Sequence, residues 1–199
     1  TEMQDLIELR KTLRQQNFGW YAKMLEGAFL PKAMLDPMQS GRALWWGTSG
    51  ERGLQRNELG AFVLRITKEM GITIWGADLR REIPDIGHGE MIAEAVKWCR
   101  TVEQHGVSGR LHSVEWLLST ARMLLWLREG RFCSKSEAAD WGYLHLDGEW
   151  RLHLPEAKRI RRQPELAGTM DVKAWLDGLM PAIKEAASDL RSELSQQRG

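Results

Sequence analysis

The stretch REGRFCSKSEAADWGY, from Arg128 to Tyr143, decides how the second half of the chain folds. The apolar run LLSTARMLLWL before it ends at Gly130, a residue type that commonly ends helices. A few residues later, Ser134 is followed at the third position by Glu137, which is the pattern of a capping box. The sequence therefore predicts two consecutive helices joined by a short connection.

Lys135 lies in the first turn of the second predicted helix, where a cation is unfavourable. The amides at a helix N-terminus carry a partial positive charge, so a lysine beside them costs roughly 0.3–1 kcal/mol. Two interpretations follow from the residues alone. Lys135 is either an exposed residue that the fold tolerates, or a cation that binds an anion together with the free amides.

Every long segment after Pro84 has the spacing of a helix. Five helices with short connections predict an antiparallel helical bundle. Because proline disrupts a helix interior, Pro181 predicts a kink in the last helix. The predicted helical segments are 89–106, 111–130, 134–146, 148–162 and 170–194.

The first 84 residues have a mixed pattern, which predicts a small α+β region before the bundle. We expect two domains, 1–84 and 85–199, and a fold that is mainly α. The predicted N-terminal elements are a helix over 2–15, a strand within 20–35, a long loop over 36–53 with a short strand at LWW, a helix over 57–70 and a strand within 71–78.

The composition excludes several classes of protein. With 28 basic and 27 acidic residues, the chain has no overall field that would attract nucleic acid. No apolar run approaches the roughly 20 residues that span a bilayer, and the start is not a signal peptide, so we expect no membrane partner. The isolated cysteines Cys99 and Cys133 indicate a reducing compartment, and we expect a cytoplasmic protein.

The order of features from Val114 to Trp141 resembles the C-terminal helical domain of the aminoglycoside nucleotidyltransferases. The resemblance rests on an arginine late in an apolar helix, a terminal glycine and then the segment SKSEAADW. Within that family, the chain most resembles the streptomycin and spectinomycin adenylyltransferases. The segments MGITIWGADLRREIPDI and LEGAFLPK extend it over about residues 22–165. The resemblance implies a resistance-type enzyme that transfers AMP from ATP, with Mg²⁺, to a hydroxyl of an aminoglycoside antibiotic.

The resemblance also implies roles for three cationic residues. Arg122 and Lys135 match the positions that hold the ATP phosphates in that family. Arg161 stands where the family has a tyrosine near the nucleotide. It either adds attraction for phosphate or belongs to an exposed basic face of the helix.

Four further residues match positions near the antibiotic. Glu26 falls where the family has the carboxylate that deprotonates the hydroxyl; its alternative role is a charge on an exposed strand edge. Trp45 and Trp46 lie near the tryptophan that stacks on the antibiotic. His112 stands where relatives have an aspartate that contacts antibiotic amines. A protonated histidine cannot make that contact, so streptomycin is the less favoured substrate.

One family feature is missing from the sequence. A Gly-Ser turn followed by an Asp-x-Asp pair binds the metal in these enzymes, and this sequence contains no Asp-x-Asp. We expect the metal-binding segment to precede Thr1 or to come from another chain. An unpaired sheet edge near Glu26 would then pair with a second copy or with a complementing chain.

Two functions therefore remain open. The chain is the larger part of a nucleotidyltransferase, or it is a non-catalytic module that binds a nucleotide or an aminoglycoside. A purely structural helical bundle would explain the helices but not the ordered match to the family.

Overall fold

The computed structural model describes residues 2–15, 27–47 and 50–197, and the chain divides into two compact units. The N-terminal unit comprises Thr1–Gly60 and Arg81–Pro84. The helical unit comprises Ala61–Arg80 and Asp85–Gly199. Among the described residues, no helix combines the length and the apolar character needed to cross a bilayer.

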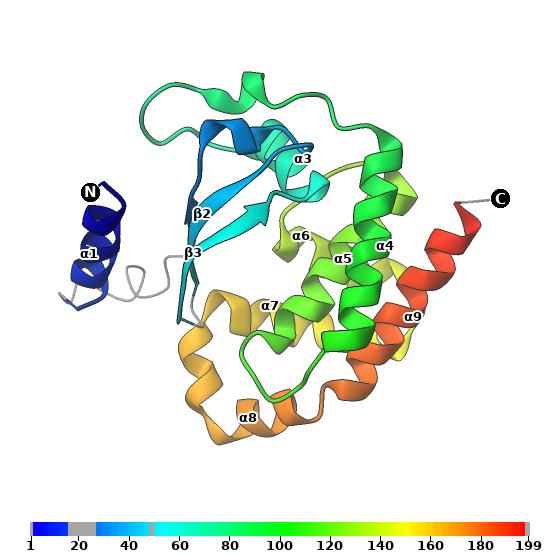
Figure 1. Ribbon diagram of the computed structural model, residues 1–199. Helices are drawn as coiled ribbons and strands as arrows, with labels where there is room; N and C mark the ends of the chain where they lie inside the picture. Colours follow the sequence, from blue (N-terminus) through cyan, green and yellow to red (C-terminus); the bar gives the residue numbers. More distant parts are fainter. Residues whose placement is uncertain (1, 16–26, 48–49, 198–199) are drawn as a thin grey trace. The chain divides into compact units, whose positions relative to one another are not determined.

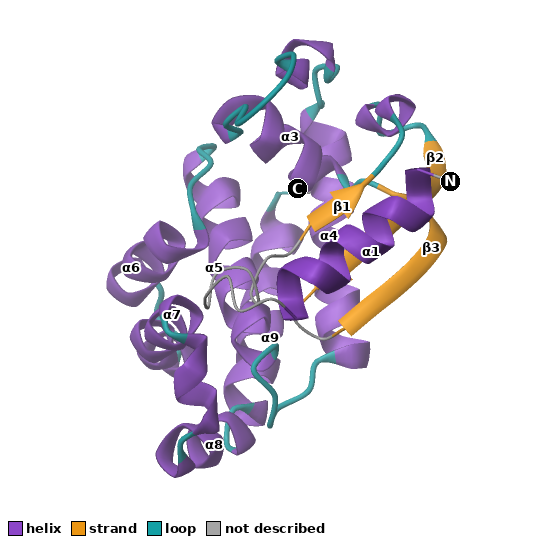
Figure 2. Ribbon diagram, turned by 90° about the vertical axis from the view of Figure 1, so that its left-hand side faces the viewer, coloured by secondary structure: helices purple, strands orange, loops and turns teal. Residues whose placement is uncertain are grey.

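A three-stranded antiparallel sheet forms the core of the N-terminal unit, with the order β1-β2-β3 (Figure 2). Gly27 pairs with Trp46 across β1 and β2, and Ser40 pairs with Glu58 across β2 and β3. The elements of this unit are α1 (Glu2–Gln15), β1 (Gly27–Phe29), the 3₁₀ turn η1 (Lys32–Leu35), β2 (Ser40–Gly47) and β3 (Gly50–Glu58).

The prediction of a long loop over residues 36–53 is wrong, although the short strand predicted at LWW is confirmed as part of β2. This stretch contains β2 and the start of β3, which pair with each other and so satisfy their backbone groups. The glycine, serine and proline residues of this stretch are typical of turns, so its sequence does not predict a hairpin. Strand formation depends more on pairing with a neighbouring strand than on the intrinsic preference of each residue. In the segment predicted as a strand, only Gly27–Phe29 is a described strand, and a 3₁₀ turn follows Pro31. The helix over 2–15 is confirmed.

The helical unit is built around α5, which packs against α6, α7 and α9, while α4 packs against α9 (Figure 1). From Trp116 to Leu127, every residue of α5 is buried except Arg122. The fold class is confirmed as mainly α, with a small α+β N-terminal part. Elements of the unit are α3 (Ala61–Met70), α4 (His88–His105), α5 (Ser113–Glu129), α6 (Lys135–His145), η3 (Glu149–His153), α7 (Leu154–Arg162), η4 (Pro164–Gly168), α8 (Met170–Asp177) and α9 (Met180–Gln196). The 3₁₀ turn η2 (Leu79–Glu82) is divided between the two units after Arg80.

The capping box predicted at the start of α6 is confirmed. The backbone amide of Glu137 donates to Ser134 Oγ at 3.2 Å, and the amide of Ser134 donates to Glu137 Oε2 at 2.8 Å. The kink predicted at Pro181 is wrong, because the segment is two helices separated at Gly178. Pro181 lies in the first turn of α9, where its missing N–H has no helical partner to lose.

The segment 71–78 is a loop, so the strand predicted there is wrong. Arg80 closes this loop by donating to the carbonyl oxygen of Gly71 at 2.8 Å and to Asp78. Ile74 and Trp75 are almost fully exposed, and the β-branched pattern has no partner strand among the described residues. The helical unit includes α3, which precedes the predicted domain boundary after residue 84. That boundary stays a prediction.

Candidate functional site

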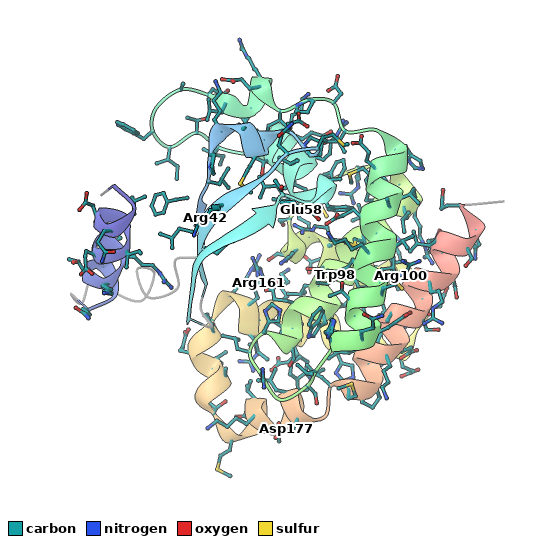
Figure 3. All side chains as sticks on the ribbon, viewed as in Figure 1. Arg42, Glu58, Trp98, Arg100, Arg161 and Asp177 are labelled. Atoms are coloured by element: carbon teal, nitrogen blue, oxygen red, sulfur yellow. The ribbon has the colours of Figure 1, made fainter. Side chains whose placement is uncertain are left out.

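Three helix termini of the helical unit bring charged side chains together. Glu115 lies in the first turn of α5, Lys135 in the first turn of α6, and Arg161 in the last turn of α7. Figure 3 labels Arg161 where it leaves α7. With Arg122, which follows Glu115 by two turns on the same face of α5, these residues form the charged cluster: Glu115, Arg122, Lys135 and Arg161.

Glu115 links the three helices through both of its carboxylate oxygens. Lys135 Nζ donates a hydrogen bond to Oε2, and Arg161 Nη1 donates one to Oε1. The side chains of Glu115 and Lys135 are only 17% and 21% exposed, whereas that of Arg161 is 41% exposed. The cluster is therefore partly shielded from water but remains open at Arg161.

Burial and charge have opposite effects on the titration of Glu115. Burial by itself raises the pKa of this carboxyl, but the charges and hydrogen bonds of Lys135 and Arg161 outweigh it, and the pKa lies below its ordinary value. Burial lowers the pKa of Lys135; Glu115 opposes this shift only in part, and Arg122 and Arg161 add to it. Neutral pH therefore keeps Glu115 ionised, and Lys135 gives up its proton more readily than an ordinary lysine.

Arg122 is the member of the cluster with an unused donor. Its Nε is buried and has no hydrogen-bond partner among the described residues. The guanidinium carbon lies 5.8 Å from the centroid of the Phe62 ring on α3, within reach of a cation–π interaction. Burial lowers the pKa of Arg122, yet an arginine stays protonated at neutral pH. A buried cationic donor without an acceptor is a feature that an anionic ligand would satisfy.

The charge of the cluster favours anions. Three cations face one carboxylate, so the cluster carries a net charge of +2, although Lys135 and Arg161 both pair with Glu115. The amides at the start of α6 add partial positive charge beside Lys135. Such a combination of cationic side chains and a helix N-terminus is suited to phosphate groups.

Aromatic side chains lie next to the cluster at the start of α5. The ring of His112 lies 5.4 Å from that of Trp116 in an edge-to-face arrangement, and Trp116 lies 5.3 Å from Trp98 on α4. His112 is exposed, and Trp116 Nε1 is buried without a hydrogen-bond partner in the described part of the chain. The exposed position of His112 is compatible with contact to a ligand, and its assigned role stays a prediction.

The structure thus brings together the three residues predicted to bind phosphate. Arg122, Lys135 and Arg161 all belong to the charged cluster, although their role in nucleotide binding stays a prediction. Glu26 lies outside the described residues, as does the side chain of Trp46. Trp45 is on β2 in the other unit, and its Nε1 is buried with no partner among the described residues.

Sequence reasoning missed Glu115, the residue that connects the cluster. Glu115 precedes Arg122 by two helical turns and follows His112 by one, so it shares their face of the helix. A carboxylate at this position suits the first turn of a helix, so nothing in the local sequence marks it as a partner of distant cations. Phe62 was missed because cation–π contacts leave no pattern in sequence.

Side chains that bind metal ions do not cluster among the described residues. No three histidine, cysteine or acidic side chains among them gather closely enough to hold a metal ion. Glu115, the carboxylate of the cluster, already accepts hydrogen bonds from two cations.

Comparison with known proteins identifies the family of the helical unit. Residues 82–186 match the family model described as aminoglycoside adenylyltransferase, C-terminal domain. No curated protein matches the chain, and no solved structure matches it. The matched stretch covers more than half of the 199 residues and contains the whole charged cluster. The chain therefore belongs to the family of the aminoglycoside adenylyltransferase C-terminal domain.

Proposed function

We propose that this protein acts in the transfer of AMP from ATP to a hydroxyl of an aminoglycoside, and that the charged cluster binds the triphosphate. The observation that carries the proposal is the convergence of Arg122, Lys135 and Arg161 from α5, α6 and α7. Membership of the adenylyltransferase family supports the reaction class. The buried, unpartnered Nε of Arg122 supports an anionic ligand.

In this reaction the hydroxyl oxygen of the antibiotic attacks the α-phosphorus of ATP. A bond from that oxygen to phosphorus forms, the bond to the leaving pyrophosphate breaks, and the hydroxyl proton passes to a base. We propose Glu26 as this base and the charged cluster as the group that holds the leaving phosphates. Fixed cations at that position would stabilise the charge that develops on pyrophosphate as it leaves.

We propose a contact to the antibiotic for His112, Trp45 and Trp46. Tryptophan side chains offer rigid faces on which a polar ring can stack. His112 carries no fixed negative charge, so it supports hydrogen bonding rather than an ion pair with an ammonium group. This would disfavour streptomycin as the substrate.

A non-catalytic nucleotide-binding or aminoglycoside-binding module is the second candidate function. Two observations favour it: the sequence has no Asp-x-Asp pair, and the described residues hold no group of metal ligands. If the protein is instead the transferase, its metal-binding segment would come from a preceding segment or from another chain. A second copy or a complementing chain at the sheet edge near Glu26 is the partner we propose for that case.

Pyrophosphate release distinguishes the two functions. A version of the protein that also carries the metal-binding Asp-x-Asp segment is incubated with ATP, Mg²⁺ and either spectinomycin or streptomycin, and pyrophosphate is measured together with calorimetric binding of ATP. Release that depends on the antibiotic, and that stops in Glu26→Gln, supports the transferase. Binding of ATP without release supports the module. If ATP does not bind, both the transferase and the nucleotide-binding module are refuted.

A further inference from the structure

Glu115 occupies two of the three cations that a bound phosphate would use. Lys135 donates to one carboxylate oxygen and Arg161 to the other, so neither oxygen is left without a cation. The Glu115 side chain is only 17% exposed, and water therefore replaces these contacts poorly. A phosphate that approaches the cluster meets a carboxylate already in place.

Arg122 is in a different state from its two neighbours. Its Nε is buried and has no acceptor in the described part of the chain, and its guanidinium rests against the face of Phe62. Arg122 therefore has an unused donor, whereas Lys135 and Arg161 become available only when Glu115 releases them. An anion with a single phosphate can use Arg122 without displacing the carboxylate.

We propose that Glu115 is an internal counter-anion that competes with bound phosphate for Lys135 and Arg161, so that the cluster selects polyphosphates over monophosphates. This inference rests on the proposed function, because it assumes that the charged cluster is the phosphate site. A triphosphate carries enough negative charge and enough oxygens to reach all three cations and displace Glu115. Orthophosphate or a nucleoside monophosphate gains too few contacts to do so.

The same carboxylate has a second effect in the absence of ligand. Arg122, Lys135 and Arg161 repel one another, and without Glu115 the half-buried cations would face no negative charge. Glu115 keeps them assembled until a polyphosphate takes its place. Glu115 therefore both holds the three cations together and makes the cluster selective for polyphosphates. The free energy of ligand binding includes the cost of displacing Glu115 from Lys135 and Arg161.

Calorimetry with tripolyphosphate and orthophosphate tests the inference. Replacing Glu115 by glutamine removes the competing charge and keeps the shape of the side chain. We expect Glu115→Gln to bind orthophosphate at least 10-fold more tightly than the unmodified chain does. The affinity for tripolyphosphate should increase less in this variant. The dissociation constant of orthophosphate divided by that of tripolyphosphate should therefore fall. Glu115→Asp keeps the charge and should retain most of the selectivity.

Glu129→Gln is the matched control on the same helix. Glu129 lies fourteen residues after Glu115, about 21 Å along α5, which is farther than the screening length of about 10 Å at 0.1 M salt. It pairs with Arg131 instead of the cluster. Its replacement removes one negative charge from the same helix and should change neither dissociation constant by more than 2-fold.

A titration of the unmodified chain keeps the inference testable if Glu115→Gln does not fold. The side-chain carboxyl of Glu115 is followed by carbon-13 NMR against pH, with and without tripolyphosphate. Displacement by phosphate removes its two cations and adds a neighbouring anion, so the pKa of Glu115 should rise on binding. An unchanged or lower pKa in the bound state overturns the inference.

The outcomes separate this inference from the proposed function. If the unmodified chain binds tripolyphosphate and Glu115→Gln binds both anions more weakly, the inference fails while the phosphate site stands. If neither form binds either anion, the inference and the assignment of the site fail together. If the selectivity changes as expected but no AMP is transferred, the inference holds and the transferase function fails.

Discussion

Lys135 donates a hydrogen bond to Glu115, twenty residues earlier in the chain, and this contact joins the first turns of α5 and α6. It explains how a lysine is accommodated at a helix N-terminus. The carboxylate of Glu115 adds negative charge beside Lys135, in addition to that of Glu137 in the first turn of α6. Arg161 binds the same carboxylate from α7, so one residue organises three helix ends.

Anion binding should weaken as the pH rises, and this loss should begin at a lower pH than the ordinary lysine pKa of 10.5 would give. Burial, together with Arg122 and Arg161, lowers the pKa of Lys135 in spite of Glu115. As the pH rises through that lowered pKa, the cluster loses one positive charge, while its two arginines remain protonated. Calorimetric titration of tripolyphosphate from pH 7 to pH 10 measures the loss.

The Lys135→Arg variant is the control for this pH dependence. Its guanidinium stays charged throughout the range, and the ligand titrates identically in both experiments. The variant should therefore lose less affinity than the unmodified chain between pH 7 and pH 10. Equal losses in the two proteins would show that Lys135 does not titrate at the site.

Glu115→Gln should destabilise the ligand-free fold at neutral pH by about 1–3 kcal/mol, because it leaves half-buried cations without a partner. The pKa of Glu115 lies below its ordinary value, so its ionised form stabilises the fold above that value. This contribution disappears as the pH falls through the lowered pKa. Denaturant unfolding at several pH values should show that the unmodified chain and Glu115→Gln differ less in their free energy of unfolding as the pH falls. A difference that does not change with pH would contradict the account.

A carboxylate of α9 fixes the turn before α7. Glu185 accepts hydrogen bonds from the backbone amides of Glu149 at 2.9 Å and Trp150 at 3.0 Å. Hydrogen bonds to a charged group contribute about 1.5–3 kcal/mol each. We expect Glu185→Ala to lower the free energy of unfolding by about 2 kcal/mol or more, measured by urea denaturation. Lys184→Ala, on an exposed position of the same helix, is the comparison and should change it by less than about 0.5 kcal/mol.

Cys99 should be almost inert towards alkylation. Burial, followed by the hydrogen bond to Glu103, raises the pKa of its thiol to about 11. The thiolate is the reactive form, so at pH 8 the native protein should react with iodoacetamide at least about 100-fold more slowly than the unfolded chain. Mass spectrometry of Cys133→Ser, which leaves Cys99 as the remaining cysteine, measures this rate. Rapid native alkylation would mean that α4 opens locally at Cys99.

Local patterns predicted the helical unit well because its elements carry their own signals. Ser134 and Glu137 mark the start of α6, and Gly130 ends α5 in a left-handed conformation with a φ of 69°. Pairing between distant segments is not encoded in this way. The sequence therefore predicts a loop where β2 and β3 pair, and a strand at the β-branched residues after Gly71, which form a loop.

The candidate site shows the same division. The family resemblance pointed to Arg122, Lys135 and Arg161, which the structure brings into one cluster. It did not point to Glu115, because an acid in the first turn of a helix is ordinary and its partners lie 20 and 46 residues away. Contacts over such separations follow from packing of the helices and not from spacing within one of them.

Thermal stabilisation by ATP tests the central claim that the charged cluster binds the triphosphate. At saturating ATP the unmodified chain should unfold about 5–10 °C higher than without ligand. The double variant Arg122→Ala, Lys135→Ala should lose this shift relative to its own ligand-free value. The matched double variant Lys158→Ala, Arg159→Ala removes the same residue types from outside the cluster, where they pair with Asp140 and Glu156, and should keep it. An undiminished shift in the first variant would contradict the account.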